Sequence, residues 1–463
     1  MKKNIFAFLN GMFLLLFSSC QSDIMDSKQP ENISVKAFNK RVVSNQPTND
    51  YYDVNSLGEK NQMFSEHYSA KYEKDRLQSD FLLTDFMPTG FYVEANKALT
   101  LNVEQISGTT LPKLLIGTYA RKGISNKPQE VQLAAGLNTI TANDKGGLLW
   151  VRYGNDLSPS SKVKITFESG YEKVPLFIKN KTESTHFASQ ILSASAGVDD
   201  ALLIGQNVYI VLSKRQKDLS TQNNNSILEK IDTYLKLEDD LIGLDNSSDL
   251  HRSMKIPQLL TICIPAYAGG FAQSYVAATS YGIKDDFVKI ARHEFGHLHQ
   301  QSWTTQPETI AQFFTISVGV DANIPKNKYA EGYGTWSNVW LDMDDYFNKS
   351  IDERDYSKIQ NYNARLSGAG WLGAAMLIQL KYAYGNDFYS KLFKITREER
   401  PIFKNSSDKY EYFMTKSCKI SGYDLTDFFK KWGFKFPNAY SAIAALQLPK
   451  PPVDPSTFKD YKD

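Results

Sequence analysis

The hydrophobic pattern of this 463-residue chain changes its period part-way along. Between residues 75 and 175, apolar and polar side chains alternate, most clearly at 99–103 and 163–167. Alternation with period two is typical of strands that bury one face. Further on, apolar residues recur at helical spacing, as they do at 227–235. The sequence therefore predicts an α+β protein in which a β-sandwich (75–175) precedes a mainly helical domain (176–448).

Shorter signals predict individual elements. Apolar runs that are separated by turn residues predict further strands at 114–116, 137–140, 148–153 and 208–212. An apolar helix is expected at 371–384, where Gly385 supplies a C-cap, and another at 423–432. The proline-rich tail (449–463) is expected to be irregular.

The N-terminus carries an export signal. Lys2 and Lys3 precede an apolar run at 5–17, which small residues and Cys20 follow. This pattern is typical of a secretory signal peptide (1–19), and the run is too short to span a bilayer comfortably. It resembles the bacterial lipoprotein signal, which implies that Cys20 is lipidated; the alternative is an ordinary signal peptide with a chance cysteine. We expect an exported lipoprotein, anchored in the outer membrane or cell surface by a flexible polar tether (20–74).

Composition excludes one class of partner. The net charge is only +2, and Lys and Glu are interspersed along the chain, so the clustered basic face of a nucleic-acid-binding protein is not expected. We expect a monomer. Two cysteines remain after processing, Cys263 and Cys418, and they either pair or stay as thiols.

One motif predicts a metal site. His293 and His297 are four residues apart with Glu294 between them, in the pattern His-Glu-x-x-His. On a helix, such residues lie on one face, about 6 Å apart along the axis, so both imidazoles can reach one ion. The ion expected is a single Zn²⁺, and Glu294 is expected to act as the general acid and base on its bound water. The alternative is a histidine pair that only makes hydrogen bonds in a core.

Zinc needs a third protein ligand. His299 is close, but it lies about 200° around the helix from His297 and should point away, as a residue behind the ligands or at the surface. Glu308 is the better candidate, because Pro307 can begin a second helix that returns to the histidine pair. The alternative for Glu308 is a solvated residue of a first helical turn. The metzincin pattern is excluded, since Gln300 and Trp303 stand where it needs Gly and His.

These residues resemble a known family. His293-Glu294-Phe295-Gly296-His297, followed by Trp303 and Glu308, is similar to the motif of the enhancin-like, mucin-degrading metallopeptidases. Pro88-Thr89-Gly90-Phe91 and Gly146-Gly147-Leu148-Leu149 resemble the β-sandwich of that family, and 428–434 resembles its C-terminal end. The resemblance implies a zincin-type catalytic domain, zinc bound by His293, His297 and Glu308, and Glu294 as general acid and base.

The resemblance also implies a substrate. We expect a zinc endopeptidase that cleaves O-glycosylated, mucin-like host glycoproteins. Candidates for substrate contact are Gly269 and Gly270 upstream of the motif helix, Trp303, and an aromatic group of Tyr333, Trp336 and Trp340 that could otherwise be core. Two alternatives stay open: a surface lipoprotein that binds glycans or proteins through an inactive zincin fold, and a zinc aminopeptidase acting on free peptides.

Overall fold

The computed structural model of the chain describes residues 46–81, 83–117, 128–215, 218–263, 272–275, 285–324, 336–362 and 370–460. These residues divide into two compact units. One unit holds the residues up to Lys236 together with Asn246–Leu298, and the other holds Leu237–Asp245 together with the residues from His299 on. Within the described ranges, every strand belongs to the first unit and the second unit is helical.

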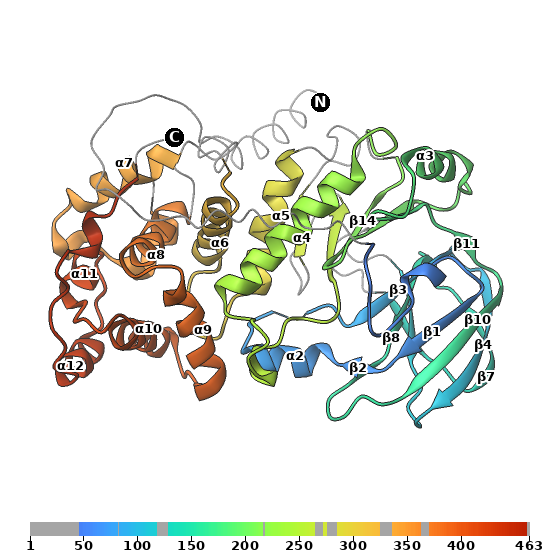
Figure 1. Cartoon of the computed structure of the whole chain (residues 1–463), viewed down its shortest axis with the longest axis horizontal. Helices are drawn as coiled ribbons and strands as arrows, with labels where there is room; N and C mark the ends of the chain where they lie inside the picture. The colour runs from blue at the N-terminus through green and yellow to red at the C-terminus, as the bar shows by residue number, and fades with distance from the viewer. Residues whose placement is uncertain are drawn as a thin grey trace, which may run out of the picture. The chain divides into compact units, whose positions relative to one another are not determined.

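The first unit begins with a β-sandwich, whose strands run from blue to green in Figure 1. Its two antiparallel sheets have the strand orders β1-β10-β4-β7 and β11-β3-β8-β5-β6. The strands of the first sheet are β1(Asn61–Ser65), β4(Ala98–Ser107), β7(Gly136–Thr141) and β10(Lys162–Ser169). Those of the second are β3(Phe86–Val93), β5(Lys113–Ile116), β6(Gln129–Gln132), β8(Gly147–Arg152) and β11(Glu172–Lys173), and β2(His67–Tyr68) pairs separately with β9(Gly154–Asn155).

The alternation of apolar and polar residues in the sequence corresponds to side chains that point alternately into the core of this sandwich and away from it. Leu101 and Ile165 are fully buried, whereas the polar residues on either side of them are not. Within the second sheet, the Trp150 ring of β8 packs edge-on against Phe86 of β3, with ring centroids 5.2 Å apart. The predicted strands at 99–103, 114–116, 137–140, 148–153 and 163–167 are all present. The predicted N-terminal β-sandwich is therefore confirmed.

The predicted tether is wrong for its second half. Residues 46–74 contain the short helix η1(Val54–Ser56), the edge strand β1 and most of α2(Ala70–Leu77). Tyr52, Leu57 and Phe64 from this segment lie in the sandwich core. The segment is polar in sequence because an edge strand needs few apolar residues, and because some of its buried side chains are polar. That of Gln62, for example, donates a hydrogen bond to Thr89 O at 2.7 Å. Residues 20–45 lie outside the described part of the chain.

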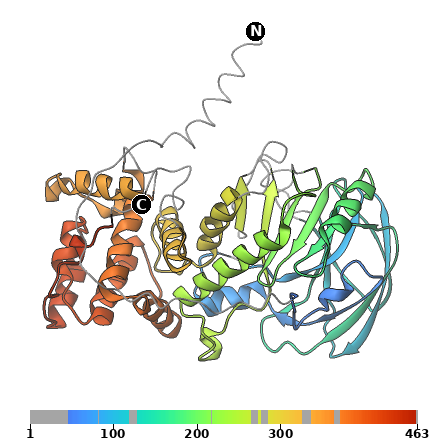
Figure 2. The same cartoon turned by 45° about the horizontal axis from the view of Figure 1, so that its top comes forward.

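A third sheet, of five strands, follows the sandwich. The sequence predicted only one of these strands, at 208–212. The order of the sheet is β12-β13-β14-β15-β16, and only the β13/β14 pair is antiparallel. The strands are β12(Leu176–Ile178), β13(Asp200–Ile204), β14(Val208–Ser213), β15(Gln258–Cys263) and β16(Ala272–Tyr275). Helices α3(Ser184–Ser193) and α4(Asn224–Leu241) connect its strands, and α5(Asp285–Leu298) follows β16 and contacts it. Figure 2 shows α4, in yellow-green, running along this sheet.

Most of the mixed sheet escaped prediction because strands such as β12 and β13 are buried on both faces. All five residues of β13 are buried, and after Asp200 they form a continuous apolar run without alternation. Tyr209 of β14 belongs to the same hydrophobic cluster as the sandwich, and its ring centroid lies 6.2 Å from that of Trp150. The core is thus continuous from the sandwich into the mixed sheet. The predicted boundary at 175/176 separates two sheets but does not divide compact units.

The second unit is a group of packed helices, coloured orange to red in Figure 1 apart from the ochre α6. They are α6(Pro307–Asp321), α7(Trp336–Phe347), α8(Trp371–Tyr384), α9(Asp387–Glu399), α10(Ser406–Ser421), α11(Thr426–Lys431) and α12(Pro437–Ala445), with short turns η4(Ile351–Glu353) and η5(Tyr356–Asn361). Helix α8 lies at the centre, in contact with α6, α7 and α9. It has the predicted bounds and ends at Gly385, whereas α11 is shorter than the predicted 423–432.

The C-terminal tail packs on this unit. Apart from the short turn η6(Pro455–Thr457), its described residues form no regular element, as expected. The side chain of Gln379 in α8 donates hydrogen bonds to the carbonyl oxygens of Ser456, at 2.9 Å, and Phe458, at 3.1 Å. Across the described residues of both units, no helix combines the length and apolar character needed to span a bilayer.

Candidate metal centre

Helix α5 carries both histidines of the motif. The helix begins at Asp285, as predicted, and its buried stripe consists of residues spaced three or four apart: Val288, Ala291, Phe295 and Leu298. This stripe fixes the rotation of the helix about its axis. His293 and His297 lie off the stripe and are half-buried, so their rings remain accessible to an ion.

The two imidazole rings face the same point. Their centroids are 4.8 Å apart and their planes are nearly perpendicular, at 87°. On its other side, the His297 ring packs against Phe81, at a centroid distance of 5.9 Å. Two residues on successive turns of one helix thus present their nitrogens together, as the spacing predicted.

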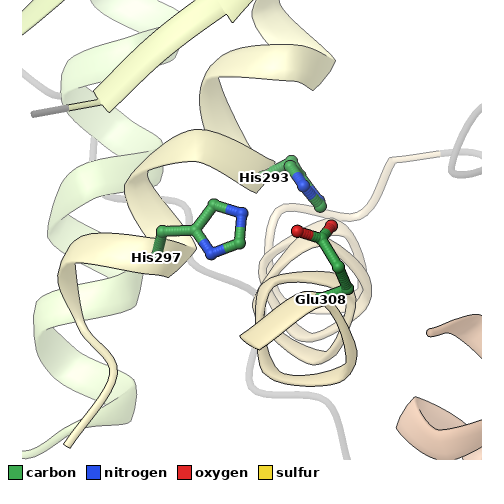
Figure 3. A group of neighbouring side chains, drawn as sticks. All are labelled: His293, His297 and Glu308. Atoms are coloured by element: carbon green, nitrogen blue, oxygen red, sulfur yellow. The ribbon is translucent and has the colours of Figure 1, made fainter. Parts of the chain in front are cut away.

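Glu308 completes the group from α6. Pro307 is the first residue of this helix and Glu308 the second, so the carboxylate projects from the first turn. One ligand atom from each of His293, His297 and Glu308 can be chosen so that all three lie within 4.8 Å of one another. In Figure 3 the Glu308 carboxylate points toward both imidazoles. Among the described residues, this is the group of side chains able to hold a metal ion.

The chemistry of the three donors suits zinc. Two imidazole nitrogens and one carboxylate oxygen are a known ligand set of catalytic zinc, and such a set leaves a fourth position for water. Glu294 is half-buried and lies one residue after His293, about 100° around α5.

His299 is not part of this group but is more than a surface residue. Its ring is buried, and its Nδ1 and Nε2 lie 3.0 Å from carboxylate oxygens of Glu238 and Asp239, respectively. Burial alone would lower the pKa of His299, but the hydrogen bonds and charges of Asp239 and Glu238 outweigh burial and raise that pKa to about 10. The His299 imidazolium, directly after α5, thus forms ion pairs with two residues at the end of α4.

The loop between the two ligand-bearing helices is largely buried, although most of its residues are polar. The side chain of Gln300 donates to Pro307 O at 2.8 Å, and that of Gln306 donates to Tyr356 O at 2.6 Å and to the Tyr410 hydroxyl at 2.8 Å. These glutamines are at most 6% exposed. Sequence reasoning missed them; the available signal was the number of amide side chains in a short loop that has to satisfy its own backbone.

The candidates for substrate contact have different outcomes. Gly269, Gly270 and Tyr333 lie outside the described residues, and Trp336 begins α7 but its side chain is not described. Trp340 is fully buried, so it belongs to the core. Trp303 is wrong as a substrate contact: it is 4% exposed, and its ring stacks on Phe413 and meets Phe393 edge-on. Its position close to the metal motif is accounted for by packing in the core.

Comparison with known protein families defines the class. The family model "Peptidase M60, enhancin and enhancin-like" matches residues 170–433, and the model of the N-terminal domain of M60-like peptidases matches residues 68–168. The two matches meet close to the predicted boundary between sandwich and helical domain. The chain belongs to the M60 family of enhancin and enhancin-like peptidases. No curated protein matches it.

Solved structures share the fold at low sequence identity. The ZmpB metallopeptidase from Clostridium perfringens is 20% identical, with a TM-score of 0.66 over 86% of this chain and 83% of that one. The M60 catalytic domain of Clostridium perfringens ZmpC, in complex with the sialyl T antigen, is 19% identical, with a TM-score of 0.60 over 85% and 81%. A metallopeptidase in complex with Tn antigen is 18% identical, with a TM-score of 0.66 over 87% and 82%.

Proposed function

We propose that this protein is a zinc-dependent endopeptidase that hydrolyses peptide bonds in O-glycosylated, mucin-like glycoproteins. The observation that carries the proposal is the convergence of donor atoms from His293, His297 and Glu308 within 4.8 Å. Membership of a peptidase family supports peptide hydrolysis as the reaction. The ligand set supports zinc as the metal.

Each residue has a distinct task in this proposal. His293 and His297, fixed by one helix, and Glu308, from the next, hold the ion. When bound, zinc supplies positive charge that makes a water more acidic and stabilises negative charge on the scissile carbonyl oxygen. The Glu294 carboxylate accepts the proton of the attacking water and then delivers it to the amine of the leaving group.

The substrate class rests on relatives. Two solved structures with the same fold were determined in complex with the Tn antigen and with the sialyl T antigen. This supports a glycosylated protein as the substrate here. An exported lipoprotein would meet such substrates outside the cell, and we therefore retain lipidation at Cys20 and surface anchoring as part of the proposal.

The test is digestion of one mucin domain in its O-glycosylated and enzymatically deglycosylated forms, with cleavage sites mapped by mass spectrometry. We expect internal cleavage of the glycosylated form, one zinc ion per chain by elemental analysis, and a folded but inactive Glu294→Gln variant. Equal cleavage of both forms would remove the glycan requirement. Equal activity of wild type and Glu294→Gln would remove the catalytic role of Glu294.

Two further measurements separate the alternatives. Cleavage of peptides with blocked N-termini excludes an aminopeptidase, which needs a free amine. Glycoprotein binding without cleavage, by a zinc-loaded protein, would favour the inactive binding lipoprotein instead.

The lipid anchor has its own test. Cys20→Ala should move the protein from the membrane fraction to the soluble fraction, and an unchanged distribution would contradict lipidation.

A further inference from the structure

The first turn of α6 rests on two glycines at the start of α8. Gly370 is the N-cap of α8 and has a φ of +84°. A Cβ atom placed on Gly370 would lie 3.0 Å from the carbonyl carbon of Glu308 and 3.1 Å from both its oxygen and the Thr309 nitrogen. At Gly373, a Cβ would lie 2.8 Å from Cγ2 and Oγ1 of Thr309. Ordinary carbon contacts are about 3.5–4.0 Å, so neither position has room for a side chain.

The same turn is also tied to its surroundings by buried hydrogen bonds. Thr309 is only 2% exposed, and its hydroxyl donates to Gln306 Oε1 at 3.2 Å. Gln306 is in turn bonded to the backbone of Tyr356, whose hydroxyl donates to Gly373 O at 3.0 Å. The turn that carries Glu308 is therefore tied to Tyr356 and, through it, to Gly373, and added volume at the two glycines presses directly on it.

We infer that Gly370 and Gly373 are positioning residues for the Glu308 carboxylate. Without side chains there, the first turn of α6 sits deep enough for Glu308 to reach the two histidines. At Gly370 the opposing atoms are backbone, which cannot rotate away, so a methyl group would move Glu308 itself by a few tenths of an ångström. Zinc sites tolerate about 0.2 Å in ligand distances, so such a shift weakens binding. The inference rests on the proposed function, because it takes Glu308 as a metal ligand.

The main test compares Gly370→Ala with Gly422→Ala. Gly422 ends α10 with a φ of +75°, similar to that of Gly370, but nothing lies within 4 Å of a Cβ built there. The two variants thus share the backbone strain and differ in the push on Glu308. Zinc affinity is measured by competition with a chromophoric chelator, and thermal unfolding in EDTA compares the metal-free proteins. We expect Gly370→Ala to bind zinc about tenfold more weakly than Gly422→Ala, at a similar loss of thermal stability.

A second variant avoids backbone strain. Gly373 is helical, so Gly373→Ala strains no backbone and adds close contacts only with the Thr309 side chain, at 2.8 Å, and with Ile359 Cγ2, at 3.0 Å. We expect weaker zinc binding in Gly373→Ala and partial recovery in Gly373→Ala/Thr309→Ala, which removes the two closest atoms and leaves the Ile359 methyl group. Gly370→Ala should gain nothing from Thr309→Ala, because its contacts are to backbone. This selective rescue would not be seen if the glycines served stability alone.

The outcomes separate this inference from the proposed function. If wild type binds zinc, Glu308→Ala loses it, and both glycine variants bind within about twofold of the Gly422→Ala control, the positioning role is wrong and the metal site stands. If wild type fails to bind zinc, or Glu308→Ala binds it as wild type does, the ligand assignment fails and takes the positioning role with it.

Discussion

The two elements that supply the candidate ligands do so by different means. His293 and His297 lie on one helix, and their spacing alone brings the imidazoles together. Glu308 stands on a separate helix, and its place depends on Gln306 at the N-cap of that helix, whose side chain bonds to Tyr356 and Tyr410, 50 and 104 positions further along the chain. A ligand pair within one helix is specified locally. A ligand on another element is specified by the fold, so its loss can follow from changes far from the metal.

The largest expected effect is on catalysis, at the local element. Glu294→Gln keeps size and shape but removes the proton acceptor, so kcat/KM on a glycosylated substrate should fall by about a thousandfold. Zinc content should not change, because Glu294 is not among the three ligands. Steady-state kinetics and elemental analysis of the same preparation check this. A variant that lost zinc as well would show that Glu294 supports the ion directly.

The next effect is on metal binding and tests the two elements against each other. His297→Ala and Glu308→Ala should each weaken zinc binding by more than the roughly 10–100-fold expected for loss of an outer-shell partner. Chelator competition on the purified variants measures both. If Glu308→Ala bound zinc with near-normal affinity, the two histidines on α5 would suffice to hold the ion, and the ligand role of the second helix would be wrong.

Trp303 tests whether the loop between the ligands is structural. Trp303→Ala removes a ring that packs on Phe393 and Phe413, and it should lower the free energy of unfolding by about 3–5 kcal/mol. Chemical denaturation of the metal-free protein gives the value. An unchanged stability with a raised KM would return Trp303 to the substrate-binding candidates.

The smallest expected effect concerns Gln306. Gln306→Ala leaves the Tyr356 carbonyl oxygen without this donor in a buried setting, which should cost about 1–3 kcal/mol of unfolding free energy. Lys409→Ala, whose amine reaches Thr304 O from a partly buried position, is a milder control in the same loop. If Gln306→Ala lowers zinc affinity and Lys409→Ala does not, the position of Glu308 depends on the buried bonds of Gln306 in particular.

Much of the sandwich could be predicted, because β4 and β10 each bury one face and so alternate. Apart from the strand at 208–212, the mixed sheet could not be predicted, since β13 is buried throughout and its four apolar residues do not alternate with polar ones. Phe64 and Tyr52 were hidden in a polar N-terminal stretch because an edge strand contributes only isolated apolar side chains. In each case, the missing information was which faces are covered by residues distant in the sequence.

The candidate site shows the same limit. The histidine pair and Glu294 follow from helical spacing, and Pro307 marked the start of the helix that bears Glu308. The roles of Trp303 and His299 could not be read, because burial against Phe413 or between Glu238 and Asp239 is a property of the assembled unit. The tight approach of Gly370 to Glu308 leaves no trace in local sequence.

The continuous core of the first unit bears on how this chain can be recombined. Tyr209 of the mixed sheet packs near Trp150, and its hydroxyl donates to that of Tyr52 at 3.1 Å, so one apolar interior serves sandwich and mixed sheet alike. The sandwich is therefore not an exchangeable module, even though a separate family model covers it. In a chimaera joined near residue 169, core side chains from two different parents would have to pack against each other in one hydrophobic core. Grafts that keep residues 46–263 from a single parent avoid that mismatch.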